Sequence, residues 1–213
     1  MFHKTNRSVL AVSFLLTACS APDSTTEVAV SEASNRHLGE QSETHSCDNA
    51  NQNGTALFGD LHIHTRYSFD AAANSTGATP EDAHRYARGE EIPIFPINDQ
   101  GVAVGRTKID RPLDFLAVTD HGEFLGERAL CRTASSPVYS TAFCVGYRSD
   151  ERLGMVMLSS VITTETPTRI PEICGQDGSL CRDYAKSPWE DIQAVSNRAN
   201  TPCEFTSFVA YEY

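Results

Sequence analysis

The sequence predicts an α/β fold for residues 54–213, because segments with strand and helix patterns alternate there. Short apolar runs at 56–64, 114–119 and 205–213 have strand patterns. Helix-start signals occur near residues 79 and 187, between those runs. We therefore expect a sheet that contains parallel strands and has helices packed against it.

The first strand is predicted over residues 56–64, where a polar stretch gives way to apolar residues. It contains His62 and His64, which are two residues apart. Side chains alternate along a strand, so both imidazoles are expected on the same face. Their place at the end of the strand makes them candidates for a common site.

A helix and an irregular excursion are expected next. Thr79 followed by Pro80 and two acidic residues is a helix-start signal, and Gly89 suits the C-terminal end of that helix. Residues 92–109 hold apolar patches that prolines and a polar turn interrupt. This pattern indicates a hairpin-like excursion.

The later segments repeat the order of strand and helix. Residues 114–119 form a short apolar run that is typical of a buried parallel strand, and a helix is expected over 123–130. The sequence Ser-Pro-Trp-Glu from residue 187 resembles a capping box and predicts that a helix begins there. Residues 205–213 have the composition of a strand.

The N-terminus predicts export. A basic start, an apolar run and Leu-Thr-Ala before Cys19 have the pattern of a lipoprotein signal peptide over residues 1–18, with Cys19 as the lipidated residue. The apolar run is too short to span a bilayer, which needs about 20 residues. Ser20 resembles the pattern of lipoproteins anchored in the outer membrane of Gram-negative bacteria; an ordinary secretory signal is the alternative. Residues 19–53 are polar and predict a disordered tether.

Charge and cysteine content narrow the possible functions. The formal net charge is −11, and such an acidic chain argues against a nucleic-acid surface. Cysteines after Cys19 suit an oxidising compartment, and the absence of a Cys-x-x-Cys pair argues against a thiolate zinc site. We expect a local disulfide between Cys174 and Cys181; buried free thiols are the alternative.

The strongest functional signal is Asp-Leu-His-Ile-His-Thr at residues 60–65. Two imidazoles on one face of a strand can converge on one cation, and histidine is a common ligand of zinc and similar metals. Asp60 precedes the pair, and Asp70 follows it in a polar loop. We therefore expect a metal site; a solvated histidine pair is the alternative.

A second signal is Asp120-His121, directly after the strand at 114–119. Functional residues gather at the carboxyl ends of parallel strands, so these side chains are expected beside the first histidine pair. The alternative is that Asp120 caps the following helix, which leaves His121 unexplained. Glu212, at the end of the last predicted strand, is a third candidate.

These motifs together resemble the PHP (polymerase and histidinol phosphatase) superfamily of metal-dependent phosphoesterases. The resemblance lies in Asp-Leu-His-x-His-Thr with a following Ser-x-Asp, then Thr-Asp-His, then a strand ending in Glu. Residues 59–65, 80–89 and 114–124 look more closely like the DUF3604 family. The resemblance implies that residues 54–213 are part of a distorted α/β barrel with seven strands.

The resemblance also implies a site for up to three Zn, Mn or Fe ions. The implied ligands are His62, His64, Asp70, His121 and Glu212. The two histidines of the first motif would hold one metal, Asp70 and His121 would lie at another, and Glu212 would bridge two. Asp60 and Asp120 would be further ligands or would orient the imidazoles. The implied reaction is hydrolysis of an anionic phosphate ester, with a metal-bound hydroxide as nucleophile.

The sequence departs from the superfamily in one respect. No histidine follows His121, whereas a site for several metals needs ligands from later strands. We therefore expect residues 54–213 to be the N-terminal portion of a hydrolase domain, inactive without the remainder. Two other functions stay open: an amidohydrolase-type enzyme, whose barrel also starts with His-x-His, and an exported lipoprotein without catalytic activity.

Overall fold

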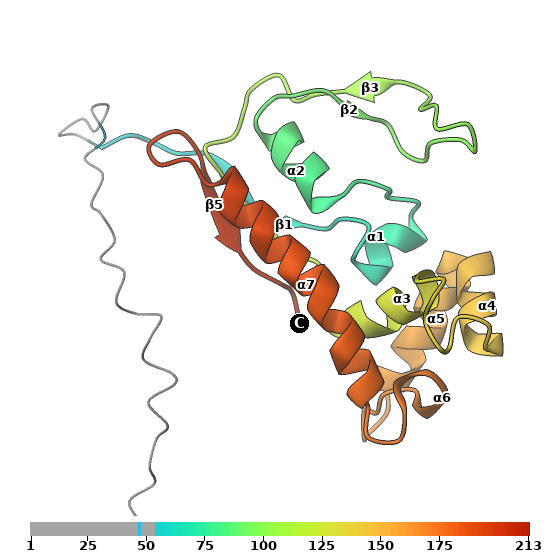
Figure 1. Cartoon of the computed structure of the whole chain (residues 1–213). Helices are drawn as coiled ribbons and strands as arrows, with labels where there is room; N and C mark the ends of the chain where they lie inside the picture. Colours follow the sequence, from blue (N-terminus) through green and yellow to red (C-terminus); the bar gives the residue numbers. More distant parts are fainter. Residues whose placement is uncertain (1–46, 48–53) are drawn as a thin grey trace, which may run out of the picture. The chain divides into compact units, whose positions relative to one another are not determined.

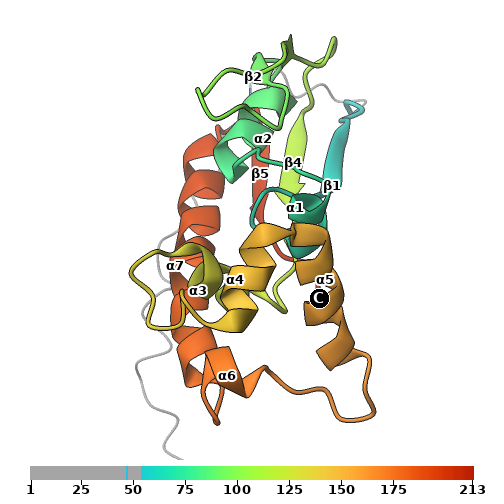
Figure 2. The same cartoon turned by 90° about the vertical axis from the view of Figure 1, so that its right-hand side faces the viewer.

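A computed structural model describes Cys47 and residues 54–213, so the predicted signal peptide (1–18), Cys19 and most of the predicted tether lie outside the described residues. The described part is a mixed α/β structure with a small parallel sheet (Figures 1 and 2). In chain order its elements are β1 (Gly59–Ile63), α1 (Phe69–Ala73), α2 (Pro80–Ala87), β2 (Ile92–Pro93), β3 (Arg106–Thr107), β4 (Phe115–Val118), α3 (Leu125–Arg132), α4 (Ala142–Ser149), α5 (Glu151–Ile162), α6 (Pro171–Cys174), α7 (Ser179–Ala199) and β5 (Thr206–Val209). None of the helices in this part is long and apolar enough to cross a membrane.

The main sheet has the order β1-β4-β5, and both outer strands run parallel to β4. β4 is the buried strand that its apolar run predicts, because Leu116, Ala117 and Val118 are 3% exposed or less. Since the three strands run in one direction, their carboxyl ends meet at one edge of the sheet. Within residues 54–213 the sheet is open, and the seven-stranded barrel stays a prediction.

Helices α2 and α7 pack against the sheet and cover its apolar core. Leu116 and Val118 of β4 form a buried cluster with Ala87 of α2 and Phe205 just before β5. In Figure 2 both helices lie beside the strands, α7 with its C-terminal half, while its N-terminal half extends toward α3 and α6.

The predicted start of α2 is confirmed. The Thr79 hydroxyl accepts the backbone N–H of Asp82, and the Asp82 carboxylate accepts the backbone N–H of Thr79. Gly89 follows the helix with a positive φ of 82°, a conformation that glycine adopts without strain. The short strands β2 and β3 pair antiparallel, which confirms the hairpin-like excursion over residues 92–109.

Helices α3 to α6 and the first half of α7 surround a second core. Two disulfides lie inside it, Cys131–Cys144 and Cys174–Cys181, and all four cysteines are 0% exposed. The expected bond between Cys174 and Cys181 is therefore confirmed, and the alternative of free thiols is wrong. A third disulfide joins Cys47 to Cys203.

The predicted helix start at residue 187 is wrong, because α7 begins at Ser179 and contains Pro188 in its interior. A proline inside a helix removes one backbone hydrogen bond and crowds the carbonyl four residues earlier, at a cost of about 3 kcal/mol, which other contacts can outweigh. Here the preceding turns are held by the Cys174–Cys181 bond and by the side chain of Asp177, which accepts the N–H of Ser179 at 3.0 Å. The last strand is also shorter than predicted, since β5 ends at Val209.

Candidate metal centre

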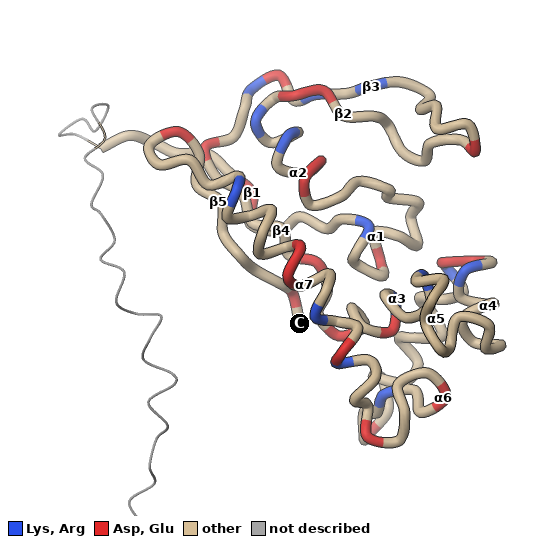
Figure 3. Tube along the Cα trace, viewed as in Figure 1, with Lys and Arg blue, Asp and Glu red and all other residues tan. Residues whose placement is uncertain are grey.

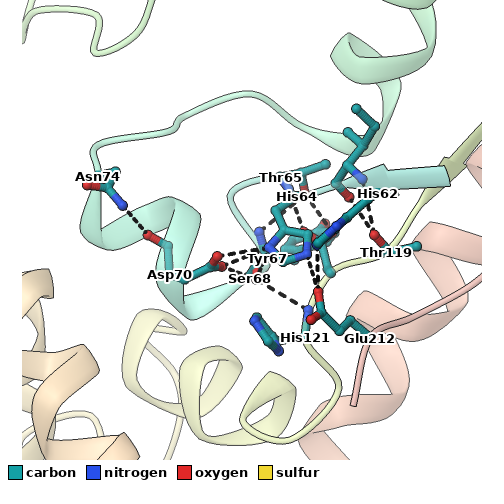
Figure 4. A network of polar contacts seen from close by, with 12 residues as sticks. His62, His64, Thr65, Tyr67, Ser68, Asp70, Asn74, Thr119, His121 and Glu212 are labelled. Atoms are coloured by element: carbon teal, nitrogen blue, oxygen red, sulfur yellow. Dashed lines mark hydrogen bonds and ion pairs between the residues drawn. The ribbon is translucent and has the colours of Figure 1, made fainter. Parts of the chain in front are cut away.

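The candidate site lies at the carboxyl ends of the three parallel strands (Figure 4). His62 and His64 come from the end of β1, His121 follows β4, and Glu212 follows β5. The strand pairing continues beyond the regular sheet, because an isolated parallel bridge joins His121 to Glu212. Asp70 enters from the first turn of α1. The structure thus brings together all five residues that the sequence predicts as metal ligands.

The first group of side chains consists of His62, His64 and Glu212. One oxygen of Glu212, Oε2, lies 3.0 Å from Nε2 of His62 and 2.7 Å from Nε2 of His64. The His62 side chain is 71% exposed, whereas that of His64 is 13% exposed. Three ligand atoms therefore converge on one point that is open to solvent on the side of His62. The same convergence accords with the expectation that both histidines share one strand face.

The second group consists of His64, Asp70 and His121, whose possible ligand atoms all lie within 4.8 Å of one another. Nδ1 of His64 is 2.9 Å from Oδ2 of Asp70. Ser68 connects the group, because its hydroxyl donates to Asp70 and accepts the backbone N–H of His121 at 3.2 Å. Glu123 Oε2 lies 3.2 Å from Nδ1 of His121. Hydrogen bonds from two loops thus position this group.

His64 belongs to both groups, with Nε2 toward Glu212 and Nδ1 toward Asp70. A neutral imidazole has one protonated nitrogen and one lone pair, so it can ligate only one metal. With the proton on Nδ1 donated to Asp70, Nε2 presents its lone pair to the first group. Glu123 can hold His121 in the same way through Nδ1. Carboxylates that orient histidine ligands like this are common in metal sites.

The charges and hydrogen bonds of the cluster shift the pKa values of its members. Burial works to lower the pKa of His64, but hydrogen bonds and charges from Asp70 and Glu212 outweigh it and raise that pKa. Burial works to raise the pKa of Asp70, but hydrogen bonds from Ser68 and His64 lower it. The pKa of Glu212 is likewise lowered, against burial, by the nearby histidines. Two ionised carboxylates therefore flank an imidazole that readily holds a proton, and a metal cation could take the place of that proton.

Asp120 and Asp60 support the backbone around the cluster. Asp120 is 1% exposed, and its carboxylate accepts the backbone N–H and, at 2.7 Å, the hydroxyl of Thr65. It does not cap α3, whose N-cap is Phe124, so the capping alternative is wrong. Asp60 is exposed, and its Oδ1 accepts the backbone N–H of His62 at 2.9 Å. Neither carboxylate belongs to the two ligand groups among the described residues.

The remaining described histidine, His84, lies away from the cluster. It is 2% exposed, and its ring nitrogens contact the carbonyl oxygen of Pro80 at 2.8 Å and Oγ of Ser207 at 2.7 Å. Burial lowers the pKa of His84 and keeps the ring neutral. This histidine links α2 to β5 and is a structural residue.

The donor types of the cluster fit a transition-metal ion. Imidazole nitrogens mixed with carboxylate oxygens suit Zn, Mn and Fe. A further group of possible ligands, Glu127 with Cys174 and Cys181, does not fit, because the two sulfurs are bonded to each other and offer no thiolate. Within the part of the chain that the structure describes, the cluster at the sheet edge is thus the candidate for metal binding.

Two supporting residues were not predicted from the sequence. Thr65 anchors the loop after β1 to Asp120, and Glu123 contacts His121. Glu123 follows His121 by two residues, and a carboxylate so near a candidate ligand is a signal that could have indicated it. Thr65 could not have been found in this way, since its partner is 55 residues distant.

Comparison with known proteins identifies the family. A family model described as a protein of unknown function, DUF3604, matches residues 51–213, which is more than half of the chain. No curated protein and no solved structure matches the chain. The match includes both histidine motifs and every member of the cluster. The chain therefore belongs to the DUF3604 family.

Proposed function

We propose that the cluster at the sheet edge is the metal centre of a hydrolase that acts on phosphate esters. The observation that carries the proposal is the convergence of His62 Nε2 and His64 Nε2 on Oε2 of Glu212, at 3.0 Å and 2.7 Å. These atoms come from strands that are neighbours of β4 on opposite sides. Three ligand atoms of two types suited to Zn, Mn or Fe, imidazole nitrogen and carboxylate oxygen, thus meet where α/β folds place their active sites.

The chain's own residues would prepare the site before a cation arrives. Nδ1 of His64 lies 2.9 Å from Asp70, and Nε2 lies 2.7 Å from Glu212. With the Nδ1 proton donated to Asp70, Nε2 would be free to bind the cation beside Glu212. Glu123 would do the same for His121. When bound, the cation supplies Lewis-acid chemistry, polarising a phosphate oxygen and an attacking water. The His62 side chain is exposed, so a substrate could approach the site from the side of this residue.

The substrate class rests on the motifs. The order Asp-Leu-His-x-His-Thr, Ser-x-Asp, Thr-Asp-His and a late Glu is that of the PHP superfamily, and we propose that this chain is a member. All of these motifs contribute side chains to the one cluster. An anionic phosphate ester would be attracted by the cations that the cluster is proposed to hold.

Metal affinity provides the first test. After EDTA treatment, isothermal titration of the full chain with Zn²⁺ or Mn²⁺ should show binding that His62→Ala with His64→Ala weakens by more than about 100-fold, since even orienting residues contribute about 10- to 100-fold. Affinity should fall as the pH is lowered, because His64 holds its proton more tightly than an ordinary histidine.

A pair of glutamates gives the matched control for this test. Glu212→Ala should weaken metal binding, whereas Glu204→Ala, an exposed carboxylate outside the cluster, should leave it unchanged. Equal affinity in the wild type and the double-histidine variant would refute the proposal. Hydrolysis of a phosphodiester rather than an amide or lactone would separate the PHP reaction from the amidohydrolase alternative. Absence of metal binding in the wild type would favour the exported lipoprotein without catalytic activity.

We also propose that the protein is exported and carries a lipid on Cys19. The sequence pattern of residues 1–18 supports this, as do the disulfides of the described part, since disulfides persist in oxidising compartments. Labelled palmitate should be incorporated into the wild type in a Gram-negative host and not into Cys19→Ala. Incorporation into that variant would refute the assignment of Cys19.

A further inference from the structure

A cavity lies next to the loop after β1, and it is separate from the metal-ligand cluster at the strand ends. Its volume is about 650 Å³, and residues from the loop after β1, from α3 and from α7 line it. A cavity of this size is in the range of sites for small organic ligands. Arg66 and Tyr67 face it, whereas the adjacent Thr65 and Ser68 bond to Asp120 and Asp70 in the cluster region.

Three arginines are among the residues that line this cavity, Arg66, Arg128 and Arg132. Arg66 makes no salt bridge within the part of the chain that the structure describes, while Arg128 and Arg132 share the one carboxylate of Glu151. Glu151 is not itself a lining residue; the acidic residue of the lining is Asp183, which is paired with Lys186 at 2.7 Å. The cavity therefore has a surplus of positive charge, although the whole chain has a net charge of −11 and its basic and acidic residues are interspersed in Figure 3.

Arg128 has an unused hydrogen-bond donor. The residue is only 4% exposed, and its two terminal nitrogens donate to the hydroxyl of Tyr147 and the carbonyl oxygen of Arg66. Its Nε is buried and has no hydrogen-bond partner in the described structure. A buried polar group without a partner is unfavourable. This nitrogen has almost no exposed surface, so what Arg128 offers a ligand in the cavity is its positive charge. Guanidinium groups match the geometry of carboxylate and phosphate oxygens.

The rest of the lining suits an apolar or aromatic body. Tyr67, Tyr184, Leu125 and Pro188 contribute rings and aliphatic surface. The hydroxyl of Tyr67 already donates to Asp191 at 2.7 Å, so this residue offers a ligand mainly its ring. Aromatic rings and aliphatic side chains would pack against an apolar group, and the arginines would bind its charged end.

We propose that this cavity binds an organic oxyanion, that is, an apolar or aromatic group that carries a phosphate, sulfate or carboxylate. The site does not depend on the proposed metal centre, because none of its lining residues belongs to the metal-ligand groups. It would give the protein a second recognition site, joined to the first by the loop of residues 65–68.

Isothermal titration of the full chain with phenyl phosphate, phenyl sulfate and benzoate tests the proposal. The titration is done in EDTA, and again with the variant His62→Ala/His64→Ala, so that metal-dependent binding does not contribute. At least one of these anions should bind, and benzyl alcohol, which has no charge, should bind at least about tenfold more weakly. The relative affinities identify which oxyanion the cavity prefers.

Two variants and a matched control locate the binding. Arg66→Gln and Arg132→Gln should each weaken the affinity for the preferred anion by about tenfold. Arg111→Gln should change it less than about twofold, because Arg111, like Arg66, is exposed and stacks on an aromatic ring, but lies outside the cavity. Failure of all three anions to bind would overturn the proposal, and so would equal losses in the three variants. Either result would leave the metal centre unaffected.

Discussion

Asp120 and Thr65 form the buried contact that joins the end of β4 to the loop after β1. Burial raises the pKa of the Asp120 carboxyl, while hydrogen bonds from Thr65 act to lower it. The Thr65 side chain is 0% exposed, so neither its hydroxyl nor its N–H has access to water. This pair therefore fixes the position of the loop after β1, next to His64, relative to the end of β4.

Replacing Asp120 tests this contact. Asp120→Ala should lower the free energy of unfolding by about 1–3 kcal/mol, because it leaves two buried donors of Thr65 unpaired. Asp60→Ala removes an exposed carboxylate that also accepts one backbone N–H, and should change the free energy by no more than about 0.5 kcal/mol. Urea denaturation in the presence of EDTA measures both. Equal effects of the two substitutions would contradict the structural role of Asp120.

Helices α3 and α7 approach each other closely at Gly126. A Cβ atom added to this glycine would lie 1.9 Å from the backbone carbonyl oxygen of Cys181. The backbone there cannot easily move, because Cys181 is bonded to Cys174 within the core. Glycine at position 126 thus permits the helix contact that positions the loop between β4 and α3.

A pair of glycine substitutions tests this packing. Gly126→Ala should lower the free energy of unfolding by about 1–3 kcal/mol or more, since the added methyl group forces the two helices apart. Gly146→Ala, within α4, meets nothing within 4 Å and should stabilise the protein by up to about 1 kcal/mol through its higher helix propensity. Thermal and urea unfolding give both values. A neutral or stabilising Gly126→Ala would show that α3 and α7 are packed less closely.

The three disulfides differ in their location within the described structure. Cys131–Cys144 and Cys174–Cys181 lie in the helical core and close short loops of 13 and 7 residues. Cys47–Cys203 spans 156 residues, and Cys203 is exposed. Disulfide exchange requires that a thiolate reach the bond, so burial should protect the first two.

Limited reduction tests this difference. Under native conditions, low concentrations of dithiothreitol should reduce Cys47–Cys203 first, and the other two bonds should react at rates set by opening of the helical core. Alkylation of the released thiols followed by peptide mass mapping identifies the order. In urea, where the core is unfolded, the difference should disappear. Earlier reduction of either buried bond would contradict the packing of the helical core.

Much of the α/β framework could be predicted from local sequence. The capping box at Thr79, the apolar run of β4 and the hairpin-like excursion depend on residues close together in the chain, and the structure confirms them. Helices α1, α4, α5 and α6 were not predicted, because they are short or surround a core that only the whole chain completes. The start of α7 was missed because Pro188 suggested a helix start, whereas the turns before it are held by the Cys174–Cys181 disulfide and by Asp177.

The sequence by itself determined which residues could form the site, since His-x-His, Asp-His and a late Glu are motifs with a chemical meaning of their own. It also indicated the strands β1 and β4 that the histidine motifs follow, because their apolar runs are local features, but it placed the end of β5 too late, since that strand ends at Val209. Only the tertiary structure decided that Glu212 meets His64 across 148 residues, and that Asp120 bonds to Thr65 and caps no helix. Such contacts depend on the order and direction of strands in the sheet, which hydrogen bonding between distant segments sets and no single segment specifies.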